Sequence, residues 1–167
     1  MKVNTTAKTS KTQRATGARK SFRSEKPEFE QKMIDLRRVA RVEAGGRRFS
    51  FRVTIVAGNR KGKVGVGVGK GADTSLAMDK AFRNAKKNAI IVPLTKEGGI
   101  PHDTDARFAS ARVMIRRSRE GSGLVAGSAV RTVLDLAGVQ NATAKLLSRT
   151  KNKINNARAA MKALQKL

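Results

Sequence analysis

The chain has no cysteine, no tryptophan and no tyrosine, and it contains few acidic residues. The lack of cysteine excludes disulfide bonds and cysteine-bound metals, and it fits a reducing cytoplasm. Because only six phenylalanines represent the Phe, Trp and Tyr class, the core must rest on Val, Ile, Leu and Ala together with these six Phe. No apolar run approaches the ~20 residues of a membrane span. The N-terminus lacks a signal-peptide pattern, so we expect no membrane partner.

The scarcity of acidic residues leaves a large positive charge. Lys and Arg number 37 against 12 Asp and Glu, which gives a net charge of +25 and a pI near 11.7. Charge of this size opposes compaction unless a polyanion neutralises it. Nucleic acid is the usual partner of so basic a protein. A membrane surface is the alternative, but no apolar anchor accompanies the charge.

The first 24 residues contain seven Lys and Arg and no acidic residue. Such a segment cannot bury apolar surface, so we predict a disordered basic arm over residues 1–27. Arg19 and Lys20 are its candidate RNA-binding residues. The alternative is a solvated tail without a ligand.

Residues 45–71 form the central pattern of the chain. Over 47–55 apolar and polar residues alternate, which predicts a half-buried strand. A basic turn at 58–62 reverses the chain. In the next strand, 63–71, valines form one face, whereas glycines leave the other open to backbone or a ligand. Seven basic residues are expected to converge on this unit and bind phosphates: Arg47, Arg48, Arg52, Arg60, Lys61, Lys63 and Lys70.

The remaining pattern is that of an α+β protein. We expect a helical turn over 27–34, a strand over 36–43 with a turn at 44–46, and a helix from Asp73. The basic face of that helix (Lys80, Arg83, Asn84, Lys87) is either solvated or ligand-bound, and the sequence does not decide. A domain boundary is expected at 90–94. The second half should contain a strand at 111–117, a helix at 124–137 ended by Gly138, a strand within 139–148 and a helix at 152–166.

The sequence does not match the motifs for catalysis or nucleotide binding that we compared with it. A Walker A loop requires Gly where the chain has Val64, and Ser or Thr where it has Gly71. Gly67, Gly69 and Ala72 match a loosened dinucleotide pattern, but no acidic residue follows about 20 positions later. His102, Asp103 and Asp105 are too few for metal or acid–base chemistry. We therefore expect no enzyme activity, no cofactor and no metal site.

Scarce aromatic residues disfavour base stacking, so the basic surface indicates shape recognition of folded or double-stranded RNA. The Gly121-Ser122-Gly123 segment is expected at the start of the second helix, where Ser122 could contact an anion. An ordinary tight turn explains this segment equally well.

Several segments resemble the bacterial small-subunit ribosomal protein S5 family. They run in the family's order over roughly 34–167: Gly45-Gly46-Arg47-Arg48-Phe49-Ser50-Phe51, Gly62 to Lys70, Ala85-Lys86-Lys87-Asn88, Ile100-Pro101-His102, and Glu120 to Arg131 continuing to Val139. The resemblance implies an N-terminal double-stranded-RNA-binding-like domain over 28–93 and a C-terminal ribosomal protein S5 domain 2-like fold over 94–167.

The resemblance also implies a role. It predicts a structural component of the 30S subunit in the cytoplasm that binds 16S rRNA, neighbours ribosomal proteins S4 and S8, and supports assembly and translational accuracy. No homo-oligomer is expected. The loop with Gly45 and Gly46 should approach RNA. The S4 side should include Arg117, Arg119, Glu120 and Gly121.

Two alternatives stay open, and the chain departs from the family pattern in places. The alternatives are a free double-stranded-RNA-binding or nucleoid-type protein and a nucleotide-using enzyme with a similar second domain. The family usually has Lys-Pro-Ala-Ser at 116–119 and Ser-Asn-Pro before the last helix, where this chain has Arg116-Arg117-Ser118-Arg119 and Arg149 to Lys153. Ala109-Ser110-Ala111 replaces a glycine-rich turn.

Overall fold

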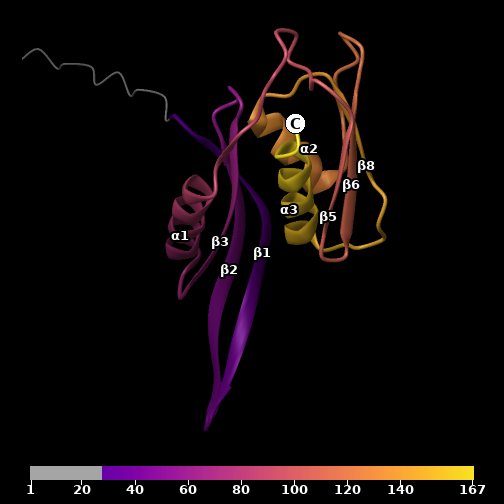
Figure 1. Ribbon diagram of the computed structural model, residues 1–167. Coiled ribbons are helices and arrows are strands. Elements are labelled where there is room, and N and C mark those ends of the chain that lie inside the picture. The colour runs from indigo at the N-terminus through magenta and orange to yellow at the C-terminus, as the bar shows by residue number, and fades with distance from the viewer. Residues whose placement is uncertain (1–27) are drawn as a thin grey trace, which may run out of the picture.

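A computed structural model describes residues 28–167, which form two four-stranded sheets and three helices (Figure 1). The predicted basic arm, including Arg19 and Lys20, lies outside the described residues. The predicted α+β class with an N-terminal and a C-terminal unit is confirmed.

The first sheet is antiparallel and carries one helix. In spatial order its strands are β1 (Glu30–Glu43), β2 (Gly46–Gly58), β3 (Lys63–Gly71) and β4 (Ile90–Ile91), and the helix is α1 (Thr74–Lys87). β1 and β2 extend past α1 as a long two-stranded arm (Figure 1).

The second sheet follows a different plan. Its spatial order is β5 (Thr104–Phe108), β6 (Ala111–Arg117), β8 (Ala142–Leu146) and β7 (Leu124–Val125), with helices α2 (Ser128–Ala137) and α3 (Lys153–Leu164). β7 and β8 are parallel and are joined through α2, so the chain forms a β-α-β crossover here.

In three places the secondary structure differs from what local sequence patterns predicted. The helical turn expected over 27–34 is wrong, because β1 starts at Glu30 and pairs along the full length of β2, with Glu30 opposite Gly58. The second helix starts at Ser128 and not at Leu124, because Leu124 pairs with Ala142 in the sheet. Strand β5 was not predicted. By contrast, β6 has the predicted bounds and Gly138 ends α2 with φ 92°.

The glycine face of β3 is not open to a ligand. Gly65, Gly67 and Gly69 lie directly under α1, and a Cβ at Gly67 would overlap the Ala81 carbonyl oxygen and lie 2.9 Å from the Ala85 Cα. The sequence left backbone or a ligand as the alternatives for this face, and the backbone of α1 is the one that occupies the space. Glycine here permits close packing of the helix on the sheet.

Helix α1 begins at the predicted cap, Asp73. Its Oδ1 accepts a hydrogen bond from the Thr74 amide at 2.6 Å and its Oδ2 accepts one from the Ser75 hydroxyl at 2.8 Å. The Ser75 bond, followed by the Thr74 bond, lowers the pKa of Asp73 below its ordinary value of 3.8. The carboxylate therefore stabilises the helix above that value, and this stability is lost as pH falls through the lowered pKa.

We expect Asp73→Ala to lower the melting temperature at pH 7, because two helix-terminal donors lose their acceptor. Asp73→Asn should retain much of the stability at pH 7, since an amide oxygen accepts the same bonds. The difference between wild type and Asp73→Asn should shrink below pH 3.8 and vanish only below the lowered pKa, where the carboxyl of the folded protein is protonated. Thermal melts from pH 7 to about pH 2 measure this, and a difference that persists at the acidic end would contradict the cap.

The structure has two hydrophobic cores, and the larger one is shared by the two halves. Val53 and Ile55 pack under α1 with Ala77 and Ala81, whereas Val56 on the opposite face joins the core that contains α2 and α3. Thr54 is also buried, so the second half of β2 is covered on both faces. The prediction of a half-buried strand is therefore wrong for β2, because residues 46–49 are exposed on both faces, residues 50–52 are partly buried and residues 53–58 are buried.

Backbone hydrogen bonds fix the basic turn at 58–62 to the second half. The Arg60 amide donates to the Leu136 carbonyl at 3.0 Å and the Gly62 amide donates to the Ala137 carbonyl at 2.8 Å. These carbonyls lie in the last turn of α2, where helix acceptors lack intrahelical partners. The turn therefore caps α2 as well as connecting β2 to β3.

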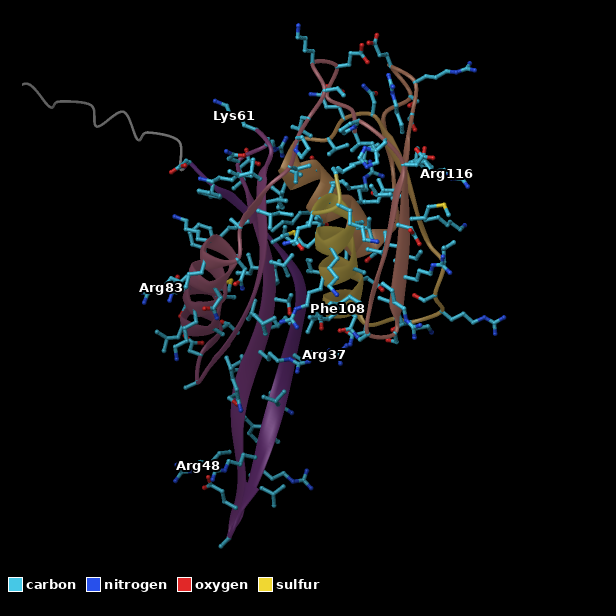
Figure 2. The ribbon with its side chains drawn as sticks, viewed as in Figure 1. Arg37, Arg48, Lys61, Arg83, Phe108 and Arg116 are labelled. Atoms are coloured by element: carbon cyan, nitrogen blue, oxygen red, sulfur yellow. The ribbon has the colours of Figure 1, made fainter. Side chains whose placement is uncertain are left out.

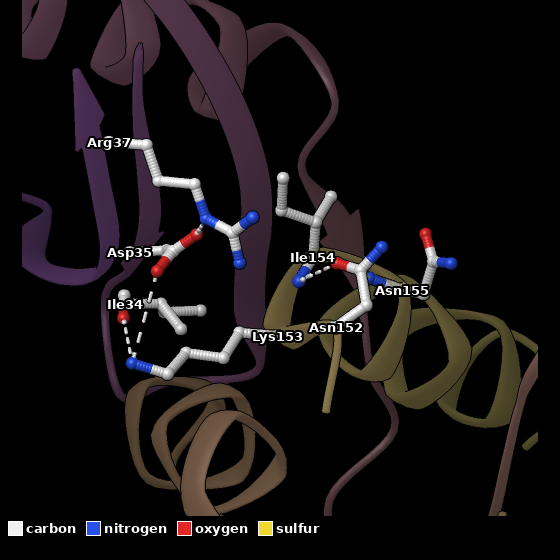
Figure 3. Close-up of polar contacts among 7 residues, drawn as sticks. All are labelled: Ile34, Asp35, Arg37, Asn152, Lys153, Ile154 and Asn155. Atoms are coloured by element: carbon white, nitrogen blue, oxygen red, sulfur yellow. Dashed lines mark hydrogen bonds and ion pairs between the residues drawn. The ribbon is translucent and has the colours of Figure 1, made fainter. Parts of the chain in front are cut away.

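A second contact joins β1 to the start of α3 (Figure 3). Lys153 Nζ donates to the Ile34 carbonyl at 3.3 Å and lies 3.9 Å from Asp35 Oδ1, while Asp35 Oδ2 accepts a bond from Arg37 Nε at 2.9 Å. Ile34 falls at a register shift between β1 and β2. Lys153 thus supplies a contact between the two halves.

Candidate nucleic-acid interface

The arm formed by β1 and β2 has one arginine-rich face. Arg41 lies opposite Arg48 and Arg37 lies opposite Arg52 in the antiparallel register. Residues that are directly opposite share a face, as do alternate residues along a strand. The four arginines therefore share one face of the arm.

The other face of the arm is mostly apolar. It includes Phe49, which is 50 % exposed, and Val42, which is 76 % exposed. The Arg38 guanidinium lies 4.4 Å from the centre of the Phe49 ring. Sequence reasoning assigned Arg48 and Arg52 to RNA but missed Arg37 and Arg41, although their spacing within β1 places them on a single face.

The tip of the arm leaves its backbone open. Gly45, with φ 90°, and Gly46 have no atom within 4 Å of the position that a Cβ would take. Next to them Arg48 Nε pairs with Glu43 Oε2 at 2.9 Å, with the Arg48 side chain 82 % exposed. An ion pair this exposed contributes about 0–1 kcal/mol. A phosphate can therefore replace Glu43 as the partner of Arg48 at little cost.

The seven basic residues expected to converge do not do so (Figure 2). Arg47 and Arg48 lie at the tip, whereas Arg60 and Lys61 lie at the opposite end of β2. The ten-residue separation of Arg48 and Gly58 along an extended strand is about 33 Å. Arg60 also pairs with Glu30 at 2.9 Å, and the Lys63 ammonium lies 6.0 Å from the Phe29 ring centre. The convergence failed because a strand of 13 residues separates its ends.

Ser122 is not at a helix start. α2 begins six residues later with Gly127 as its N-cap, and the Ser122 hydroxyl donates to the Arg119 carbonyl at 2.7 Å. Gly121 and Gly123 have φ values of 78° and 70°. The helix-terminal anion site is therefore wrong, and the ordinary turn that the sequence left open is the conformation present.

The residues predicted for the S4 side are exposed and comprise Arg117, the last residue of β6, and the loop that follows it. The Arg117 amide donates to Asp103 Oδ1 at 2.8 Å, which anchors the loop at its base. A hydrogen bond with Glu97 and the negative charge of Glu97 raise the pKa of Glu120, while Arg117 opposes the shift. The loop lies at the opposite end of the molecule from the tip of the arm (Figure 1).

A second basic surface lies where the edge of β3 meets α1. Lys70, Lys80, Arg83 and Lys87 line a groove of about 250 Å³ together with Val68, Gly69 and Asn84. The sequence left the role of this helix face undecided. The sequence alone predicts which residues share a face of β3 and which share a face of α1. It does not predict the groove, because only the fold brings Lys70 to the strand edge beside the helix.

The residues considered for catalysis have structural contacts. Asp103 holds the Arg117 amide, and Asp105 pairs with Arg112 at 3.2 Å. Close packing of α1 leaves no room for a pyrophosphate over Gly67 and Gly69. No group of three or more metal-binding side chains occurs within residues 28–167. In the same range no helix has the length and apolar character needed to cross a membrane.

Two family models match the chain. The model for the N-terminal domain of ribosomal protein S5 matches residues 29–93, and that for its C-terminal domain matches residues 106–167. Among curated proteins, small ribosomal subunit protein uS5c of Cyanophora paradoxa is 49 % identical over 87 % of this chain and 85 % of its own length.

Cyanobacterial relatives agree. Small ribosomal subunit protein uS5 of Trichormus variabilis is 48 % identical over 92 % of this chain and 88 % of its own. The protein of the same name from Thermosynechococcus vestitus is 49 % identical over 84 % and 80 %, respectively. The chain therefore belongs to the ribosomal protein S5 family, a family of structural proteins of the small ribosomal subunit and not of enzymes.

Proposed function

We propose that this chain binds 16S rRNA within the small subunit and supports subunit assembly and translational accuracy, with ribosomal proteins S4 and S8 as neighbours. The observation that carries the proposal is the exposed arm, whose open glycine tip and arginine face suit an RNA backbone. The predicted location within the small ribosomal subunit agrees with the names of the relatives.

The arm is suited to reach into folded RNA. Its base is held because the second half of β2 is buried on both faces, and its free half extends past α1 (Figure 1). Arginine forks pair bidentately with phosphate, and the glycine tip lets the main chain approach closely. Binding of this kind recognises RNA shape and not base sequence.

Two ends of the molecule would then serve two partners. RNA binds along the arm, and the Arg117–Gly121 loop at the other end contacts S4. Because the turn at 58–62 and Lys153 tie the halves together, the distance between these partners is held fixed. Such a rigid spacer supports assembly by fixing the RNA relative to a neighbouring protein.

Replacing Arg47 and Arg48 with alanine should weaken binding to a 16S rRNA transcript and flatten its salt dependence. Removing one phosphate-binding side chain lowers the slope of log K against log salt by about one unit, so the double variant should lower it by up to about two. The control is Arg131→Ala with Lys145→Ala, which removes the same charge from exposed positions in the second half. An unchanged slope for the Arg47 and Arg48 variant would contradict the proposal.

A further inference from the structure

The groove between α1 and the free edge of β3 is the strongest unassigned surface of the molecule. Lys70 supplies one cation from the strand, and Lys80, Arg83 and Lys87 supply three from the helix. None of the four forms an ion pair among residues 28–167, and no acidic side chain lines the groove. All four side chains are exposed, and Arg83 projects into solvent (Figure 2).

The stability of the fold does not explain why all four cations of the groove are present. Lys87 lies in the last turn of α1, where a cation interacts favourably with the helix dipole. Lys70 protects a strand edge in the way that lysine commonly does. Neither reason applies to Lys80 and Arg83, which lie in the middle of the helix. Four uncompensated cations side by side repel one another, which favours an anionic ligand.

The strand edge disfavours a peptide strand as that ligand. β4 pairs with β3 only at Lys63 and Val64, so the edge beyond Val64 has no strand partner in the described part of the chain. A docking strand would need the Val68 carbonyl as an acceptor. That carbonyl already accepts a bond from Asn84 Nδ2 at 2.9 Å. The surface is thus suited to a ligand recognised by charge.

The arginine face of the arm meets the groove at the free edge of β3. Arg37 lies opposite Arg52 on β2, and Arg52 lies opposite Lys70 on β3, so these three side chains form a row across three strands. This row lies on the face of the sheet opposite α1, so it passes around the edge of β3 at Lys70, which also lines the groove. On the helix side, Lys80 to Lys87 span about 10 Å along the axis. One small anion cannot contact all of these cations, whereas an extended polyanion can.

We propose that this row, from the arginine face over Lys70 to Lys80, Arg83 and Lys87, is a second RNA-backbone site that follows one strand of 16S rRNA away from the tip. The inference rests on the proposed function, because it names the same ligand. It assigns to α1 a binding role in addition to its packing role.

The test compares two triple variants. Lys80→Gln, Arg83→Gln and Lys87→Gln remove the helix cations while keeping good helix formers and leaving Asn84 in place. Arg131→Gln, Lys145→Gln and Lys151→Gln remove equal charge from exposed positions elsewhere. Binding to a 16S rRNA transcript is measured from about 50 to 200 mM salt. The groove variant should lose about two to three units of salt slope and at least about tenfold in affinity, and the control less than about one unit.

Lysine acylation read by mass spectrometry locates the contact. Bound 16S rRNA should protect Lys80 and Lys87 and leave Lys145 reactive.

Equal slopes for the two triple variants, or no protection of Lys80 and Lys87, would overturn the inference. If the Arg47 and Arg48 variant still loses affinity, the proposed function survives that result. Protection by polyglutamate but not by RNA would also overturn the inference, and a wild-type protein that fails to bind the transcript would defeat both proposals.

Discussion

Replacing Gly67 with alanine should destabilise the protein by about 3 kcal/mol or more. The added methyl would overlap the Ala81 carbonyl oxygen and the Ala85 amide nitrogen, and both belong to the backbone of α1. Backbone atoms of a helix cannot rotate away as a flexible side chain can. The helix must therefore move off the sheet, which opens the small core formed by Val53, Ile55, Ala77 and Ala81.

The measurement is thermal or urea unfolding of the free protein. A chain of this size loses about 2–4 °C per kcal/mol, so the melting temperature should fall by on the order of 10 °C. Gly127→Ala is the control, because its methyl would meet only Leu146 Cδ1, at 3.6 Å. The control should cost no more than about 1 kcal/mol. Equal stabilities for Gly67→Ala and the control would contradict the close packing of α1 on β3.

Replacing Gly138 with alanine should loosen the connection between the two halves. Gly138 has φ 92°, and a Cβ there would lie 2.6 Å from the Arg60 carbonyl carbon. A residue with a side chain pays about 1–2 kcal/mol for the left-handed conformation. The clash with the turn at 58–62 adds about 1–3 kcal/mol. The total is comparable with the expected effect at Gly67.

The location of this effect can be read from amide hydrogen exchange. The Arg60 and Gly62 amides, which donate to α2, should exchange faster in Gly138→Ala. Gly121→Ala is a matched control, since its φ is 78° but no atom lies within 4 Å of the added methyl. It should show the conformational cost without faster exchange at these amides. Unchanged exchange in Gly138→Ala would mean that the turn does not hold the halves together.

Sequence patterns predicted the parts of the fold that depend on neighbours along the chain. The bounds of β6, the Asp73 cap and the Gly138 stop follow from alternation, capping chemistry and the left-handed glycine. Patterns failed where a distant partner decides. Glu30 to Ile34 extend β1 because β2 offers a pairing edge, and Leu124 joins β7 because β8 lies beside it.

In the candidate site, too, features set by neighbours along the chain could be predicted, whereas features set by distant partners could not. The glycines at the arm tip and the adjacent arginines could be predicted, because a turn and a strand period are local features. For the glycines of β3 the sequence left backbone and ligand as alternatives, because it cannot show that α1 folds back onto them. The row formed by Arg37, Arg52 and Lys70 depends on the register of three strands, which no local pattern specifies.

The central proposal is that this chain works as a stoichiometric RNA-binding component of the small subunit. Sucrose-gradient fractionation of a cell lysate at low and high salt, with the protein quantified against rRNA, tests it most directly. We expect about one copy per 30S and 70S particle and retention through a moderate salt wash. Protein that remains at the top of the gradient, or is stripped at once by salt, would contradict the proposal and favour a free RNA-binding protein.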